Sequence, residues 1–221
     1  MKPIWKFRLF AFLAVLLVGA VSISNLAAEF IRPIAAGLPS RTSATATPDQ
    51  VSSSRKASAI APFRSDLKAE YAIALAGQTL KSEGTRGEQT DEAAQSAVKS
   101  ALKTGPHDSR MWLVLALLQM QRNLGDSLIT ESLKMSYLTG PIRAELIPIR
   151  LDAVTLHQAL NDADLKELAR GDVRVVLTEF PGQRPSLVDD YARASSIGKA
   201  FIEESARMFD PKFADSLQAK K

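Results

Sequence analysis

Four arginines in the C-terminal half of this sequence are the side chains best suited to bind a charged ligand. An arginine guanidinium carries a planar fork of N–H donors, which matches the two oxygens of a carboxylate. On one face of a helical domain, such residues would form a groove for acidic groups of a partner protein. The alternative is that they are solvated arginines on separate helix surfaces. The candidates are Arg143, Arg150, Arg170 and Arg174.

Neither of the two histidines has sequence neighbours that suggest catalysis or metal binding. His107 stands in an expected loop between Pro106 and Asp108. His157 follows Asp152 by five residues, an offset that does not bring two side chains onto one helix face. The chain also has no cysteine, and a zinc site needs several ligands. We therefore expect no bound metal and no cofactor.

Three pairs of acidic residues have the side-chain types that a glycosidase uses as acid and base. Acidic residues near a helix N-terminus stabilise the helix dipole, which explains the first pair. Solvated helix faces explain the other two pairs, and no phosphate-binding loop or nucleophile elbow occurs. We therefore expect that the protein is not an enzyme. The pairs are Asp162 with Asp164, Asp189 with Asp190, and Glu203 with Glu204.

An uncharged apolar stretch near the N-terminus, residues 9–28, has the length of a membrane span. About 20 helical residues extend about 30 Å, which matches the hydrocarbon core of a bilayer. The basic leader at residues 1–8 favours a cytoplasmic N-terminus. We predict a single-pass transmembrane signal anchor at residues 9–31, in the inner (cytoplasmic) membrane of a bacterium. The C-terminal domain would then lie in the periplasm.

A cleaved secretory signal peptide is the alternative to the anchor. Signal peptides combine a basic start with an apolar run of about 7–15 residues and small residues before the cut. A cut after Ala20 has Val18 at the −3 position, whereas a cut after Ala28 has the unsuitable Leu26 there. The apolar run continues past both sites, so we favour the uncleaved anchor.

The excess positive charge lies in the N-terminal part of the chain. Residues 1–62 carry a net charge of +5, which leaves −1 of the chain's +4 for residues 63–221. Binding to nucleic acid needs a basic face on the folded domain itself. We therefore expect a lipid bilayer and proteins as partners, and no nucleic acid.

The rest of the sequence divides into an expected linker and an expected helical domain. Residues 32–62 are rich in small residues, Ser, Thr and Pro without an apolar period, which is typical of a flexible linker. Residues 63–215 show helical periodicity and predict an all-α domain of antiparallel helix hairpins. The apolar run at residues 111–118 is too short to span a membrane, so we expect it in the domain core. Residues 216–221 are expected to fray.

Capping residues and prolines indicate where the helices begin. We expect Ser109, Asp126 and Asn161 to cap three helices, and Ser195 or Ser196 to cap a fourth. Pro148 marks either a kink or a helix start within residues 143–160. The expected helices lie near residues 66–81, 90–102, 109–121, 126–139, 143–160, 162–180, 187–194 and 196–209.

Prolines that would end helices recur after Thr104-Gly105, Thr139-Gly140 and Phe180, with spacings of 35 and 40 residues. Such periods are typical of stacked helix pairs. The middle unit carries Trp112, Leu115 and Ala116 in its first helix, Gly125 at its turn and Gly140-Pro141 at its end.

This middle unit resembles a tetratricopeptide repeat, with its Trp-x2-Leu-Gly pattern and closing proline. It departs from the pattern at Ala116, where Gly is usual, at Gln119, where Tyr is usual, and at Leu128, where a small residue is usual. The resemblance covers about 35 residues fairly and the flanking units only in period and helical content. It implies a concave groove that binds peptides or proteins.

Together these features predict a membrane-anchored scaffold or protein-protein interaction module of the bacterial cell envelope, which binds partners through a groove of its helical repeats. Two alternatives stay open. One is a cleaved, soluble periplasmic helical protein. The other is an enzyme, or an accessory protein, of envelope polysaccharide metabolism.

Overall fold

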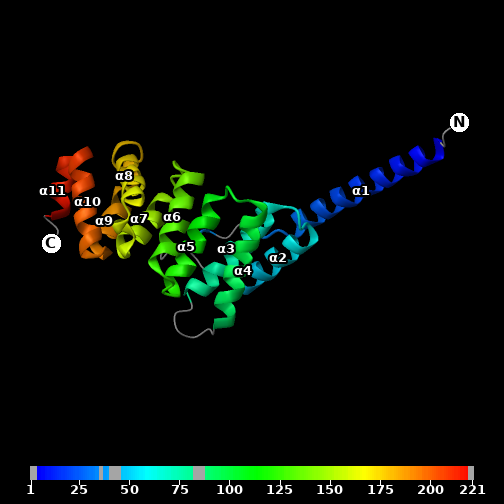
Figure 1. The fold of residues 1–221 in the computed structure, drawn as a ribbon, viewed down its shortest axis with the longest axis horizontal. Coiled ribbons are helices and arrows are strands. Elements are labelled where there is room, and N and C mark those ends of the chain that lie inside the picture. The colour runs from blue at the N-terminus through cyan, green and yellow to red at the C-terminus, as the bar shows by residue number, and fades with distance from the viewer. Residues whose placement is uncertain (1–3, 35–36, 40–45, 82–87, 219–221) are drawn as a thin grey trace. The chain divides into compact units, whose positions relative to one another are not determined.

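The computed structural model describes residues 4–34, 37–39, 46–81 and 88–218 (Figure 1). Within these ranges every regular element is helical, which confirms the predicted all-α fold. The chain forms two compact units, Met1–Gly105 and Pro106–Lys221. The predicted boundary between linker and domain at residue 63 does not coincide with this division.

The described residues of the first unit form four helices. They are α1 (Ile4–Ile31), α2 (Pro48–Ile60), α3 (Ser65–Lys81) and α4 (Glu88–Thr104). Helices α3 and α4 pack as a hairpin, and α2 packs against both α1 and α3. Small buried side chains such as Ala72, Ala76, Ala94 and Ala101 allow the helix axes to approach closely.

Helix α1 is long and apolar enough to cross a membrane over Trp5–Ile31, and the predicted anchor at residues 9–31 lies within it. None of its most apolar stretch is buried. Most of α1 projects away from the other helices of the first unit (Figure 1). Its C-terminal end differs, because Ala28 is fully buried.

The prediction of a flexible linker is wrong for residues 48–60, which form α2. The Thr47 hydroxyl accepts a hydrogen bond from the Gln50 amide at 3.2 Å, and the Gln50 side chain accepts one from the Thr47 amide at 2.8 Å. This reciprocal capping box, with Pro48 in the first turn, starts the helix. Buried Ser54 and Ala57 then provide a small packing face, which composition alone did not reveal. Linker residues 35–36 and 40–45 lie outside the described residues.

The second unit contains the remaining helices. They are α5 (Ser109–Gln121), α6 (Asp126–Thr139), α7 (Ile147–Leu156), α8 (Ala163–Thr178), α9 (Arg184–Arg193), α10 (Ser196–Phe209) and α11 (Pro211–Gln218), with short 3-10 helices at Gln158–Asn161 and Pro181–Gln183. Helices α5 and α6 form a hairpin, and α7 packs against α8, α9 and α10. The apolar run at residues 111–118 is mostly buried, as predicted.

Three of the predicted helix caps are displaced by one residue. Asp108 caps α5, Gly125 precedes α6, and Asp162 caps α8 by accepting a hydrogen bond from the Leu165 amide at 2.9 Å. Pro148 lies in the first turn of α7, so it starts a helix and does not kink one. Ser195 caps α10 as predicted.

The C-terminal tail is ordered further than predicted. Helix α11 extends to Gln218, beyond the expected domain end at residue 215. Its side chains Phe213, Ala214 and Leu217 are buried. The short apolar stripe therefore holds the tail against the unit, and only residues 219–221 of the predicted frayed tail lie outside the described residues.

Candidate protein-binding surface

The structure does not bring the four candidate arginines together in one groove. Arg143 lies exposed in the turn between α6 and α7, where its Nε donates to Glu145 Oε1 at 2.9 Å. Arg170 and Arg174 lie one turn apart on α8. Arg150, on α7, is fully buried.

Arg170 belongs to a network of ion pairs that joins α8 to α10. Its Nη2 lies 2.8 Å from Glu204 Oε1, and its Nη1 lies 3.1 Å from Glu167 Oε1. Lys166 Nζ lies 3.1 Å from the second oxygen of Glu204. Glu204 is therefore held by two cations of α8, and the surface between these helices has a defined arrangement of charges.

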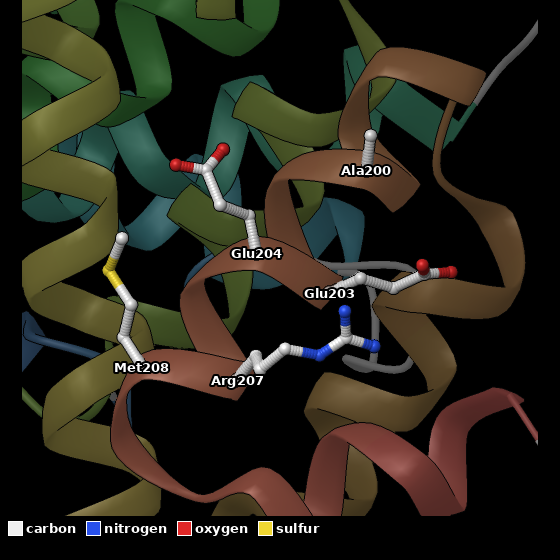
Figure 2. A pocket seen from close by; sticks show the side chains of 5 residues that line it. All are labelled: Ala200, Glu203, Glu204, Arg207 and Met208. Carbon is white, nitrogen blue, oxygen red and sulfur yellow. The ribbon is translucent and has the colours of Figure 1, made fainter.

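An open hollow of about 450 Å³ lies over the outer face of α10. Figure 2 shows Glu204 and Met208 pointing to one side of the helix, and Glu203 and Arg207 pointing to the other. Met208 is 57% exposed. The hollow thus combines a flexible apolar side chain with charges of both signs. Ala200 completes the lining.

Glu203 is positioned by side chains of the neighbouring helices. The Tyr191 hydroxyl of α9 donates a hydrogen bond to Glu203 Oε1. Gln218 Nε2 of α11 donates to Glu203 Oε2 at 3.1 Å. The hollow is therefore bordered by groups from α8, α9 and α11, although all the residues that line it belong to α10.

The prediction that Arg150 lines a surface groove is wrong, because its guanidinium lies inside the second unit. Its Nε donates to Ser136 Oγ at 3.0 Å, and its Nη2 donates to the carbonyl oxygens of Ser136 and Gly140. The last turn of a helix leaves carbonyl groups without partners, and Arg150 satisfies two of them at the end of α6. Its Cζ also lies 4.6 Å from the centroid of the Tyr137 ring.

The sequence contains a signal for this burial. Ile147, Arg150, Leu151 and Val154 follow the spacing of one helix face, and all four are buried. An arginine within an apolar stripe is thus directed into the core. The remaining groove candidates, Arg143, Arg170 and Arg174, stay predictions as partner contacts.

Asp172 of α8 is the acidic member of this buried cluster. Burial raises the pKa of its carboxyl to about 7, although Arg150 and Tyr137 lower it in part. Asp190 of α9 is also buried, and burial together with the nearby Asp152 raises its pKa to about 7. Arg193 opposes this effect through its 2.8 Å ion pair with Asp190.

These two carboxyls predict an unusual pH dependence of stability. Between about pH 4 and pH 7 the folded state holds protons that the unfolded chain has released, so stability falls as pH rises. Each group contributes a slope of up to about 1.4 kcal/mol per pH unit. Asp172→Asn is expected to reduce this slope, whereas replacement of the exposed Asp215 by Asn is not.

The measurement is urea unfolding of the full-length protein in mild detergent from pH 4.5 to 7.5. Fluorescence of Trp112 in a Trp5→Phe background reports on the second unit, since the chain has two tryptophans. Equal slopes for Asp172→Asn and Asp215→Asn would contradict the prediction.

The first acidic pair forms ion pairs with a lysine of α6, and the two histidines lie near helix ends. Lys134 Nζ donates to Asp162 at 2.8 Å and to Asp164 at 3.1 Å. His107 is exposed in the turn before α5, and His157 is half-buried after the end of α7. Among the described residues, no group of three His, Asp or Glu side chains is placed to hold a metal ion.

Known proteins provide no assignment for this surface. The chain matches no protein-family model, no curated protein and no solved structure. The packing of neighbouring helices is compatible with a helical repeat, and no family match supports membership in the tetratricopeptide repeats.

Proposed function

We propose that the protein is a membrane-anchored interaction module of a bacterial cell envelope. Helix α1 serves as its single anchor in the cytoplasmic membrane, with the basic leader on the cytoplasmic side. The helical units then lie in the periplasm and bind partner proteins. The protein performs no catalysis in this proposal, and it requires no cofactor.

The observation that carries the partner-binding role is the hollow on α10. Methionine adapts its shape readily and is common at binding surfaces, and an interface combines an apolar centre with a polar rim. Met208 provides the apolar contact beside Arg207 and the ion-paired Glu204. The exposed Arg174 extends the α8 side with a donor for acidic groups.

The exposed surface of α1 supports the anchoring role. Large apolar side chains such as Phe10, Phe12 and Leu17 are more than half exposed along this helix. A continuous apolar surface of this kind is unfavourable in water and indicates burial in a membrane or against a partner. Its length matches a bilayer.

Site-specific photo-crosslinking in intact cells tests the proposal. A photoreactive benzoylphenylalanine at Met208 is expected to give a discrete protein adduct, because this side chain would lie in the interface. Leu138 of α6, which is 65% exposed, is the matched control position in the same unit. We expect an adduct about fivefold stronger or more at position 208.

Two further measurements complete the test. Arg207→Glu is expected to weaken the adduct at position 208 by about fivefold, because it reverses a charge that lines the same hollow as Met208. The intact mass of the chain that has not reacted in the crosslinked sample checks that the anchor is retained, because the whole chain has a mass of 24.0 kDa. Equal adducts at positions 208 and 138, or no effect of Arg207→Glu, would overturn the proposed surface.

A further inference from the structure

We propose that the corner between α2 and α3 is a second membrane-binding site, which contacts the headgroup region of the bilayer that holds α1. Phe63 and Ile60 insert between the phospholipid headgroups, and Arg55 and Lys56 bind their phosphates. This inference rests on the proposed anchoring of α1 and deepens it, since it gives the first unit a defined position at the membrane surface.

The corner is attached directly to the end of the anchor helix. Ala28 of α1 is buried in a cluster with Ala57, Ala61 and Leu67. Arg64, the residue after Phe63, places its Nη1 2.8 Å from Glu29 Oε2 of α1. Phe63 therefore lies next to a residue that is bound to the last turn of α1.

A second arginine strengthens this attachment. Arg32, directly after α1, pairs with Glu70 of α3, and its Nη1 lies 2.9 Å from Glu29 Oε1. Glu70 and Glu29 raise the pKa of Arg32 further above its usual range, since both favour the charged guanidinium. The α2–α3 corner is thus held by ion pairs as well as by the apolar contact of Ala28.

The positions of the charged residues along α1 determine how deep the α2–α3 corner lies in the bilayer. The residues between Arg8 and Glu29 are uncharged and extend about 30 Å as a helix, the thickness of a hydrocarbon core. Charged groups are costly inside that core, so Glu29 and its partner Arg64 belong at the headgroup level. Phe63 is covalently attached to Arg64 and therefore lies at the same level.

After α1, the described part of the first unit exposes few large apolar side chains, and two of them, Ile60 and Phe63, lie at this corner. Phe63 is 91% exposed. Among the described residues of the unit that follow α1, the large apolar side chains that are exposed are Ile34, Ile60 and Phe63. Exposure of such side chains to water is unfavourable in free energy, whereas aromatic residues are favoured at the membrane interface.

Basic residues beside this apolar corner complement an anionic membrane. Arg55 and Lys56 are exposed on α2, and Lys56 lies one helical turn before Ile60. Basic side chains near a bilayer surface are attracted to anionic lipids. This complementarity identifies the occupant as a phospholipid surface.

The experiment measures the membrane depth of single introduced cysteines, because the chain has none of its own. Full-length Phe63→Cys, labelled with a nitrobenzoxadiazole fluorophore, is reconstituted into vesicles of phosphatidylethanolamine and phosphatidylglycerol. Spin-labelled lipids with the nitroxide at the headgroup are then added as quenchers. The matched control is Ser100→Cys on the exposed face of α4, in the same unit.

We expect headgroup quenching about threefold stronger at position 63 than at position 100, because only the former would contact lipid. Equal quenching at the two positions overturns the inference. Replacing phosphatidylglycerol with phosphatidylcholine is expected to reduce quenching at position 63. Unchanged quenching would overturn the role of Arg55 and Lys56.

A third label separates this inference from the anchor on which it rests. Val15→Cys, in the middle of α1, is expected to be quenched by lipids with the nitroxide deep in the acyl chain. Quenching at position 15 without quenching at position 63 overturns the second site and leaves the anchor intact. Absence of quenching at position 15 overturns the anchor itself, and with it the inference.

Discussion

Arg150→Met is expected to lower the free energy of unfolding of the second unit by about 3–5 kcal/mol, the cost of removing one partner from a buried charged cluster. Arg150 is completely buried, and its guanidinium donates to the Ser136 hydroxyl and to the carbonyls of Ser136 and Gly140. Methionine fills similar space without a donor. It would leave the end of α6 uncapped and Asp172 without its cation.

Three comparison variants identify the cause of this loss. Arg143→Met removes an exposed arginine and is expected to change stability by less than about 0.5 kcal/mol. Arg150→Lys keeps the charge but loses the planar fork, so an intermediate loss is expected. Adding Asp172→Asn to Arg150→Met is expected to recover part of the loss, because it removes a buried acid that must be held protonated once its cation is gone.

Unfolding by urea, followed through Trp112 in the Trp5→Phe background, measures these differences in the full-length protein. A loss for Arg150→Met no larger than that for Arg143→Met would show that the buried contacts contribute little. A full loss for Arg150→Lys combined with no recovery in the double variant would show that Asp172 does not depend on the cation.

Gly198→Ala is expected to lower the free energy of unfolding of the second unit by about 3 kcal/mol, through overpacking between α7 and α10. A Cβ atom at position 198 would lie 2.2 Å from the Thr155 carbonyl oxygen and 2.9 Å from its carbonyl carbon. These are backbone atoms, so a rotamer change of a side chain cannot relieve the contact. The same carbonyl accepts hydrogen bonds from the Ser195 amide at 3.1 Å and hydroxyl at 2.8 Å, which hold it in place.

Gly171→Ala provides a control of opposite sign. Gly171 lies inside α8, and a Cβ atom there would have no neighbour within 4 Å. Alanine is the better helix former by about 0.5–1 kcal/mol, so a small gain in stability is expected. Urea unfolding of both variants by the same fluorescence probe decides the matter. A loss at both positions, or at neither, would contradict the close approach of α10 to Thr155.

Helical periodicity allowed most of the fold to be predicted. The sequence predicts a helix near residues 162–180, and Val173, Val175 and Val176 are buried on α8, which ends at Thr178. The buried position of Met111–Leu118 was also expected. Such features depend on neighbours within one or two helical turns, so they can be recognised in the sequence.

Composition was a weaker guide than periodicity. Residues 48–60 have the small and polar residues of a linker, yet they form α2 because Thr47 and Gln50 cap it and Ala57 packs beside Ala28. The capping signal was local and readable. The packing role of Ala57 could not be recognised in the sequence, because its partner Ala28 lies 29 positions away.

The surface of α8 and α10 likewise combines features that the sequence indicates with features that depend on helix packing. The sequence indicated that Arg170 was suited to bind a carboxylate, and the structure pairs it with Glu204, 34 residues away. From the sequence, Glu203 and Glu204 fit a solvated helix face, and no pattern indicates a role for Arg207. Their arrangement around Met208 depends on the packing of α10 against α8, α9 and α11.

By itself, the amino-acid sequence determined the apolar character of α1 and most of the helical elements, α2 and α11 excepted, because these features follow from residue types at short spacings. Only the tertiary structure decided that Arg150 caps α6 inside the core, that Asp172 lies beside it, and that Gly198 meets Thr155. It also decided that the end of α1 packs into the first unit through Ala28 and ion pairs. Each of these contacts joins distant parts of the chain, so its partners become neighbours only once the helices have packed.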